Sequence, residues 1–497
     1  MPRCLRLARF ALSLVLPFAA SAADNVSRPG LLHLALDDAI RLALAKNYNI
    51  EVTRFEPRIA QENVTSALGK FDPTLSARWS IGENTQRDFF LGERHTSDTL
   101  IAQRGNLSTG LSGLTPWGLQ YDASLGLNLL SGTANTFDEA YTGSAQVSLT
   151  QPLLRNAGTA VNLAGVRIAR NNVLVSQWQL AARVIDTITD TVFTYNELHR
   201  SAENLEVAKQ SRALAQQTMD DNTKRAEIGT MSHLNISTAR AEVAAREEAV
   251  IVAQRQVKDN ENFLKQLVTN DLTPMLKVRL EIEPPPSPAF RADVPAGIRQ
   301  ALEIRPDYRQ AVLELERRNI TLAYQKNQTL PALDLTGSLR LLGFDNDPST
   351  ALDRTARRDR TEWTAGAIFS IPIPNRDARG AENAARLSAA QGLVNLQRLE
   401  QQIVVDVDNA SGQIITSRER IASTSEATRL AQESLHDGEE RLRAGTGTTF
   451  EVLELQKKLI EAEYSGLGAR ADYNKAVNEY YRQTGVTLRV YRIEVGK

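Results

Sequence analysis

The sequence is poorest in the residues that build covalent and metal-bound centres. Among its 497 residues there is one cysteine, Cys4, and there are five histidines. A single cysteine excludes a disulfide framework, a cysteine-based zinc or iron–sulfur site and, beyond the N-terminus, a cysteine nucleophile. The histidines show no ligand spacing, and the sequence contains neither a GxxxxGK[ST] nor an HExxH motif. We therefore expect that the protein is not an enzyme and has no cofactor or metal site.

The charge balance excludes a further class of function. Lysine and arginine total 58 against 59 acidic residues, so the chain lacks the basic surface that nucleic acid requires. Hydrophobic residues make up 42% of the chain, which argues against bulk disorder. We expect a folded protein that does not bind nucleic acid.

The N-terminus has the pattern of an export signal. A basic segment without acids precedes a mostly apolar run at residues 10–20, and Ala20-Ser21-Ala22 is the small-x-small pattern that signal peptidase cleaves. We therefore predict a signal peptide at residues 1–22, with cleavage after Ala22. After it, no run approaches the ~18 consecutive apolar residues of a membrane helix. The exported chain is then either soluble or a β-barrel, the other structure that satisfies its backbone in lipid.

The sequence contains two similar copies. Residues 39–44 align with 297–302 at an offset of 258, whereas residues 149–153 align with 369–373 at an offset of 220. The shared order of such matches predicts two structural repeats, residues 23–283 and 296–497, joined by a proline-rich linker at 284–295. The difference between the offsets, 258 − 220 = 38, is the number of extra residues between Pro73 and Pro152 in the first copy. We expect a larger loop or an extra hairpin there.

Both copies contain segments in which apolar and polar residues alternate. The clearest one runs from Leu119 to Leu129, where every second residue is apolar or aromatic. This alternation predicts strands at about 74–150 and about 332–372. A sheet with one apolar and one polar face is typical of a sandwich, and equally of a transmembrane barrel.

Long helical segments follow the strands. Residues 159–227 contain no proline, and at ~1.5 Å per residue they would reach roughly 100 Å. In the second copy, seven of nine positions at steps of three and four between 393 and 421 are apolar, which predicts a coiled-coil seam. Each long helix ends near a glycine, so we predict helical hairpins at about 159–268 and about 380–484. Strand-like segments are expected to follow at 277–282 and 487–491.

This plan resembles the TolC-like outer-membrane efflux and secretion channels. The local matches are residues 148–155, at a strand-to-helix boundary, and the turn 443–446 followed by 451–454. The resemblance implies an α+β fold in which a homotrimer shares one outer-membrane β-barrel, with about four strands per chain. The barrel continues as a long periplasmic α-helical barrel of coiled-coil hairpins.

The same resemblance implies a function and partners. It implies a passive exit duct in the outer membrane of a Gram-negative bacterium, in contact with outer-membrane lipid and extending into the periplasm. An inner-membrane transporter would drive it through a periplasmic adaptor protein. The residues implied at the adaptor-contacting hairpin tips are Gly229, Thr230, Gly445, Thr446 and Gly447. The alternative is a structural coiled-coil protein of the cell envelope without a pore.

The resemblance also indicates where the pore narrows. By position, the acidic residues of the family's periplasmic entrance fall on Glu451 and Glu454, three residues apart and so on one helix face. The alternative is that Glu454 pairs with Lys458 and that Glu451 is solvated. The family's basic residue two positions after the turn glycine is Gly447 here, and the acid of the first hairpin is Asn235. Other contacts would therefore have to hold this channel closed.

Overall fold

The computed structural model describes residues 30–87, 99–132, 139–228 and 232–494. The predicted cleavage site after Ala22 lies outside these residues. The chain divides into two compact units. Unit 1 comprises residues up to 48, 187–291 and 412–479, and unit 2 comprises 49–186, 292–411 and the residues from 480 onward.

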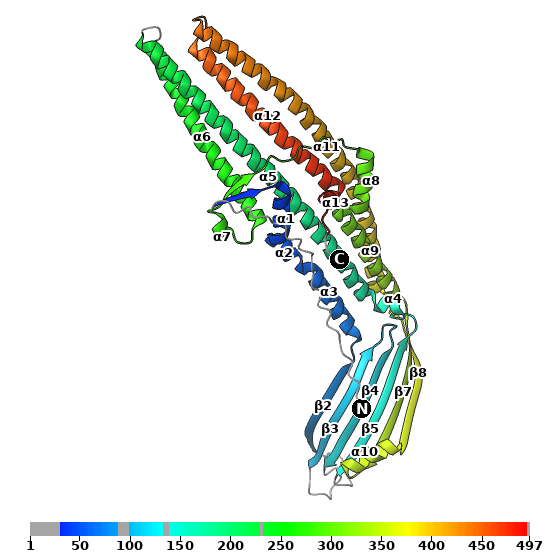
Figure 1. Cartoon of the computed structure of the whole chain (residues 1–497). Coiled ribbons are helices and arrows are strands. Elements are labelled where there is room, and N and C mark those ends of the chain that lie inside the picture. Colours follow the sequence, from blue (N-terminus) through cyan, green and yellow to red (C-terminus); the bar gives the residue numbers. More distant parts are fainter. Residues whose placement is uncertain (1–29, 88–98, 133–138, 229–231, 495–497) are drawn as a thin grey trace. The chain divides into compact units, whose positions relative to one another are not determined.

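Unit 2 contains a sheet of long strands. Among the described residues the sheet has six strands in the order β2-β3-β4-β5-β7-β8, and every neighbouring pair is antiparallel (Figure 1). The strands are β2 (Thr74–Arg87), β3 (Thr99–Leu114), β4 (Gln120–Gly132), β5 (Glu139–Pro152), β7 (Ala332–Asp345) and β8 (Arg360–Ser370). The α+β fold expected from the sequence is confirmed.

The strand number differs from the expected four or so per chain. Of the six described strands, the first copy supplies β2 to β5 and the second copy supplies β7 and β8. The additional pair is the β3–β4 hairpin, which confirms the extra hairpin expected between Pro73 and Pro152. The expected number of about four strands was too low, because the extra residues of the first copy form two more strands instead of a surface loop.

Unit 2 also contains helices. They are α2 (Tyr48–Thr53), α3 (Phe55–Leu68), the 3-10 turn η1 (Gly69–Phe71), α4 (Thr159–Asn162), α8 (Val294–Ile304), α9 (Pro306–Gln328), α10 (Pro348–Arg357) and α13 (Thr487–Val490). Val64 of α3 packs against Val166 and Ala169 at the start of α5 (Ala164–Glu227). This contact orders α3 just before η1 and β2.

The helix α10 lies against one end of the sheet (Figure 1). Gly143 of β5 and Gly343 of β7 are partners in the ladder. A Cβ atom at Gly343 would lie 2.2 Å from the Ala351 carbonyl oxygen of α10, and one at Gly143 would lie 2.8 Å from the same atom. The two glycines therefore make the space in which α10 packs on the sheet.

Unit 1 combines a small sheet with long helices. It contains β1 (Leu31–Leu34), α1 (Leu36–Lys46), α6 (His233–Val268), α7 (Leu272–Met275) and β6 (Arg279–Ile282). It also contains most of α5 and of α12 (Thr449–Thr484), and the part of α11 (Arg376–Arg443) from Gly412 onward. The strands β1 and β6 pair in parallel. The fully buried Tyr195 of α5 places its hydroxyl 3.0 Å from the Leu34 carbonyl oxygen and 2.8 Å from that of Glu283. Tyr195 thereby connects α5 to the chain at both of these strands.

The predicted coiled-coil seam is buried along only part of its length. Ile403 and Val407 are fully buried, and Ile414 is 2% exposed. Leu393, nearer the start of the seam, is 48% exposed. The seam therefore packs against neighbouring helices from about residue 403 onward.

Two boundaries differ from the sequence-based expectations. Residues 487–490 form the short helix α13 and not a strand, because their amides bond to nearby carbonyls, as Val490 N does to Val486 O at 3.0 Å. The helix α8 begins at Val294, within the expected linker, since Pro295 fits the first helical turn and the Asp293 side chain caps it. Within the described part of the chain, no helix has both the length and the apolar character needed to cross a bilayer.

Candidate functional site at the hairpin tips and the two-faced sheet

The tip of the second helical hairpin is a tight turn between α11 and α12. The amide of Thr446 donates to the Arg441 carbonyl oxygen at 2.9 Å, and the amide of Gly445 donates to that of Leu442 at 3.2 Å. Gly445 has φ +77°. This pair of bonds with a left-handed glycine is the Schellman motif, which satisfies the last carbonyls of a helix. The sequence signal, a glycine at the helix end, therefore located the turn correctly.

A side chain at Gly447 would be in tight contact with the end of α11. A Cβ atom at this position would lie 3.0 Å from the Leu442 amide nitrogen and 3.2 Å from the Arg441 Cβ. The turn, which folds back onto the end of α11, creates this close approach. A basic residue of the kind found in the family two positions after the turn glycine would require the end of α11 to shift by a few tenths of an ångström.

The first turn of α12 carries Glu451, whose surroundings the sequence did not reveal. Thr448 caps the helix, its Oγ1 accepting from the Glu451 amide at 3.2 Å. The Glu451 carboxylate accepts from Arg441 Nη1 at 2.7 Å. Arg441 was missed as a site residue because it lies ten positions before Glu451, a separation that only the turn brings together.

Glu454 lies one turn further along α12 in a different environment. Its side chain is exposed, whereas Val452 and Leu453 beside it are 2% and 7% exposed and pack inward. In the part of the chain that the structure describes, no ion pair joins Glu454 to Lys458. Glu454 thus presents its carboxylate to the surface of this chain.

The first hairpin tip is described only in part. The predicted tip residues Gly229 and Thr230 lie outside the described residues. On either side of them, Ile228 is 75% and Leu234 is 72% exposed. Phe450, at the tip of the second hairpin, is 72% exposed. Both tips therefore present large apolar side chains to their surroundings.

The two hairpins contact each other along unit 1. Arg225 Nη1 donates to the Leu442 carbonyl oxygen at 3.3 Å close to the tips. Further along, α5 meets α12 through side-chain pairs whose members are Thr218 with Gln456, Asn196 with Asn474, and Glu197 with Lys475. These polar contacts fix the hairpins side by side, so that both tips belong to one surface.

The sheet of unit 2 has two chemically different faces. In every strand pair, odd-numbered residues are paired with odd-numbered residues and even-numbered residues with even-numbered residues. The side chains of paired residues in antiparallel strands point to the same side of the sheet. One row of partners, all apolar, comprises Leu75, Leu111, Ala123, Val147, Leu339 and Trp363. The adjacent row comprises Ser76, Gly110, Ser124, Gln146, Arg340 and Glu362. Odd-numbered residues therefore form an apolar face, and even-numbered residues form a polar face.

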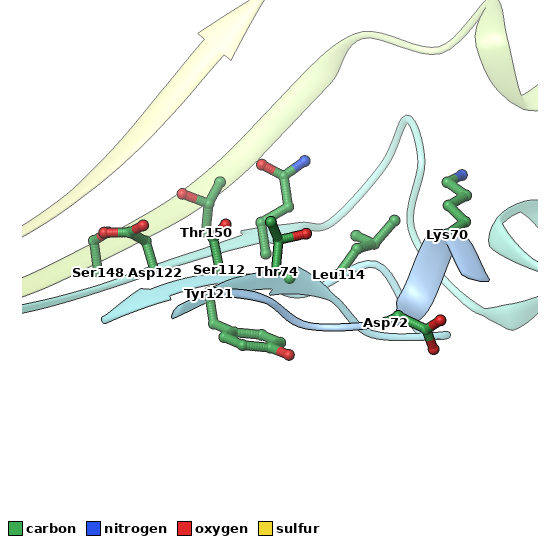
Figure 2. Close-up of a pocket in the computed structure, with 11 residues that line it drawn as sticks. Lys70, Asp72, Thr74, Ser112, Leu114, Tyr121, Asp122, Ser148 and Thr150 are labelled. Atoms are coloured by element: carbon green, nitrogen blue, oxygen red, sulfur yellow. The ribbon is translucent and has the colours of Figure 1, made fainter. Parts of the chain in front are cut away.

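The two faces of the sheet can be seen at a hollow near one end of the sheet (Figure 2). It encloses about 450 Å³. The side chains of Thr74, Asp122 and Thr150 lie on one side of the strands, and the ring of Tyr121 lies on the other. Most of the residues that line the hollow have polar side chains, among them Lys70, Asp72 and Asp122, which suits a water-facing surface.

The apolar face is exposed in the single chain. Trp79 on β2 is 74% exposed and Trp363 on β8 is 75% exposed. These two strands are the edges of the described sheet, and each pairs on one side only. Exposed aromatic side chains and open strand edges together indicate that this sheet requires an apolar environment and further strands.

The described residues were also compared with the requirements of a metal centre. Within the described ranges, no group of three or more His, Cys, Asp or Glu side chains could hold a metal ion.

The sequence has relatives of known kind. A model of the family described as outer membrane efflux protein matches residues 115–270 and 297–486. The outer membrane efflux protein BepC of Brucella suis is 21% identical over 369 residues, which cover 72% of this chain and 75% of BepC. The outer membrane protein TolC of Vibrio cholerae is 21% identical over 366 residues, covering 72% of this chain and 77% of TolC.

Solved structures show the same fold. The CmeC outer membrane channel of Campylobacter jejuni has a TM-score of 0.69 and 17% identity, with coverage of 91% of this chain and 86% of CmeC. The outer membrane protein VceC of Vibrio cholerae has a TM-score of 0.66 and 16% identity, with coverage of 90% of this chain and 96% of VceC.

Proposed function

Because this chain belongs to the outer membrane efflux protein family, we propose that it is the outer-membrane exit duct of a tripartite efflux or type I secretion system. As a member of this family it is an efflux channel in the outer membrane of a Gram-negative bacterium and extends into the periplasm. In the proposal, three copies form a passive channel. An inner-membrane transporter supplies the energy, and a periplasmic adaptor links it to the duct.

The observation that carries the proposal is the two-faced sheet with open edges. Lipid can cover the apolar odd-numbered face, and water in a lumen can contact the polar even-numbered face. Open edges cannot remain unpaired in lipid, since each unsatisfied backbone group there costs several kcal/mol. Assembly of several copies into one closed wall satisfies both requirements.

The assembly can be tested on the purified protein. We expect a trimer that needs detergent, is recovered with outer-membrane fractions and dissociates on heating. The alternative, a structural coiled-coil protein of the envelope, predicts a soluble periplasmic monomer. Recovery of that monomer from unheated cells would reject the proposal.

For the adaptor, we propose the hairpin tips as the contact surface. The exposed Ile228, Leu234 and Phe450 suit apolar contacts with the end of another helical hairpin. The predicted signal peptide contains the chain's single cysteine, so a cysteine introduced at a tip would be a unique probe. Crosslinks to the adaptor in cells are expected from these positions. Crosslinks that arise from the strands and not from the tips would contradict the assignment.

For the entrance, we propose that Glu451 and Glu454 of three chains surround the pore axis. Two carboxylates per chain would place a negative potential at a narrow opening, which attracts cations. The exposed carboxylate of Glu454 supports this role. The pairing of Glu451 with Arg441 reduces the share of the potential that Glu451 can supply.

A further inference from the structure

We propose that the membrane wall of this protein has 18 strands, six from each of three copies, and that the β3–β4 hairpin forms part of its lipid-facing surface. The inference rests on the trimer of the proposed function. It goes beyond that proposal because the resemblance to TolC-like channels implies about four strands per chain, and hence a 12-stranded wall.

The hairpin is paired on both sides. The strand β3 pairs with β2 from Thr74↔Ser112 onward, and β4 pairs with β5 from Gln120↔Thr150 onward. Neither ladder contains a shift in register, so odd-numbered residues are paired with odd-numbered residues on every strand of the hairpin and its neighbours. A loop folded against the outside of a four-stranded sheet would not show two complete ladders. The hairpin is instead inserted within the sheet.

The faces of the hairpin agree with those of its neighbours. Leu107 of β3 and Leu127 of β4 are partners on the odd-numbered face, the face that also carries Val147 of β5. On the opposite face, the Asn106 amide nitrogen donates to the Asn128 side-chain oxygen at 2.6 Å. The hairpin therefore extends both the apolar and the polar surface without interruption.

The turn of the hairpin is fixed against the strand-to-helix junction. The amide of Gly158 donates to the Trp117 carbonyl oxygen at 3.1 Å. Gly118 has φ +100°, and a Cβ atom there would lie 2.6 Å from the Asn156 carbonyl oxygen and 2.9 Å from Asn162 Nδ2. The close approach requires glycine at this point. These contacts hold the turn between β3 and β4 next to the end of β5.

The edges of the sheet are suited to pairing between copies. Because the six described strands alternate in direction, the edge strands β2 and β8 run in opposite directions. Pairing β8 of one copy with β2 of the next copy therefore continues the antiparallel order. If odd-numbered residues of β8 pair with odd-numbered residues of the next copy's β2, Trp363 and Trp79 lie on one continuous apolar surface. A second copy of this chain is thus the partner that fits each edge.

The proposed wall is wider than a 12-stranded one. With strands ~4.8 Å apart and tilted by ~40°, 12 strands give a backbone diameter of about 24 Å and 18 strands one of about 36 Å. Barrels of 16 to 18 strands leave an aqueous channel.

Spin labels on the hairpin test the proposal. Single cysteines at Leu107 and Ser108 on β3, and at Leu127 and Asn128 on β4, would be labelled in protein reconstituted in liposomes. The matched control pair is Val147 and Gln146 on β5, which is part of the wall whether the wall has 12 strands or 18. Collisions with oxygen report lipid exposure, and collisions with a polar nickel complex report water exposure.

We expect the odd-numbered labels of β3 and β4 to favour oxygen and the even-numbered labels to favour nickel, with the same alternation as on β5. Images of the trimer should also show 18 strands. Alternation on β5 without alternation on β3 and β4, in protein that still conducts ions, would overturn this inference and leave the proposed function intact. Loss of alternation on all three strands, without conductance, would instead reject the proposed function.

Discussion

Nη1 of Arg441 lies 2.7 Å from Oε1 of Glu451, across the turn that joins α11 to α12. The side chains are 57% and 36% exposed, so we expect the pair to stabilise the fold by less than about 1 kcal/mol. Its electrostatic consequence is larger, because the guanidinium offsets the charge of one of the two carboxylates proposed to surround the entrance. Glu454, one turn further along, has no such partner on this chain within the residues that the structure describes.

This arrangement predicts unequal effects of two isosteric substitutions. Glu454→Gln should reduce the preference for cations more than Glu451→Gln, since Glu454 carries the charge that Arg441 does not offset. Arg441→Gln should increase the cation preference, because it releases the charge of Glu451. Reversal potentials across a salt gradient in planar bilayers measure all three. Equal selectivity in the wild type and the three correctly assembled variants would end the assignment of these residues to the entrance.

The close approach at Gly447 predicts that the tip does not tolerate a basic residue there. Gly447→Arg should destabilise the turn by roughly 1–3 kcal/mol, the usual range for a small-to-large substitution that forces the backbone to shift. Hydrogen exchange of the amides of Thr446 and Gly447 measures the local effect. Gly468→Ala in α12 is the control, since a Cβ atom there meets nothing within 4 Å. A tip equally protected in Gly447→Arg and in the wild type would contradict the steric account.

The contact between α10 and the sheet predicts a difference between two glycines of β7. Gly343→Val should displace α10, because its Cβ would lie 2.2 Å from the Ala351 carbonyl oxygen. Gly337→Val, on the same face of the same strand, has open space around its Cβ and should leave α10 in place. Proteolysis of the segment between β7 and β8 in the reconstituted protein distinguishes them. Equal rates of cleavage in both variants would show that the glycine pair does not position α10.

The hydroxyl of Tyr195 predicts a dependence of stability on pH in unit 1. Burial raises the pKa of this phenol from 10.0 to about 12. Because the pKa is higher in the folded state, the stabilisation is complete below pH about 10 and is lost as the pH rises towards about 12. Tyr195→Phe should remove this dependence and cost about 1–2 kcal/mol, since the Leu34 and Glu283 carbonyl oxygens lose the one hydroxyl proton that they share. Denaturant unfolding at several pH values measures both effects, and an unchanged alkaline loss in Tyr195→Phe would assign it to other groups.

The sequence was informative where a pattern has one structural meaning. The alternation from Leu119 to Leu129 corresponds to β4, and the glycine at 445 corresponds to the observed Schellman turn. The strand β3 was harder to recognise, because Gln103, Gly105 and Thr109 interrupt its apolar positions on the odd-numbered face. Only the pairing with β2 and β4 decides that this segment is a strand.

Two other features depended on contacts that sequence spacing does not encode. The alternation of residues 487–491 fits a strand, yet no neighbouring strand pairs with this segment in the described structure, and it forms α13. The pairing of Arg441 with Glu451 requires the turn between them. Local patterns therefore predicted the elements, whereas the tip chemistry and the width of the sheet needed the tertiary structure.

The measurement that tests the central claim most directly is ion conduction by the purified protein in a planar lipid bilayer. The exported chain would be solubilised in detergent, identified as a trimer and added to one side of the membrane. A passive outer-membrane duct predicts discrete conductance steps without any added energy source, with a preference for cations that Glu454→Gln reduces. A trimer that inserts into the bilayer without conducting, or a chain that stays monomeric and soluble without detergent, would contradict the account.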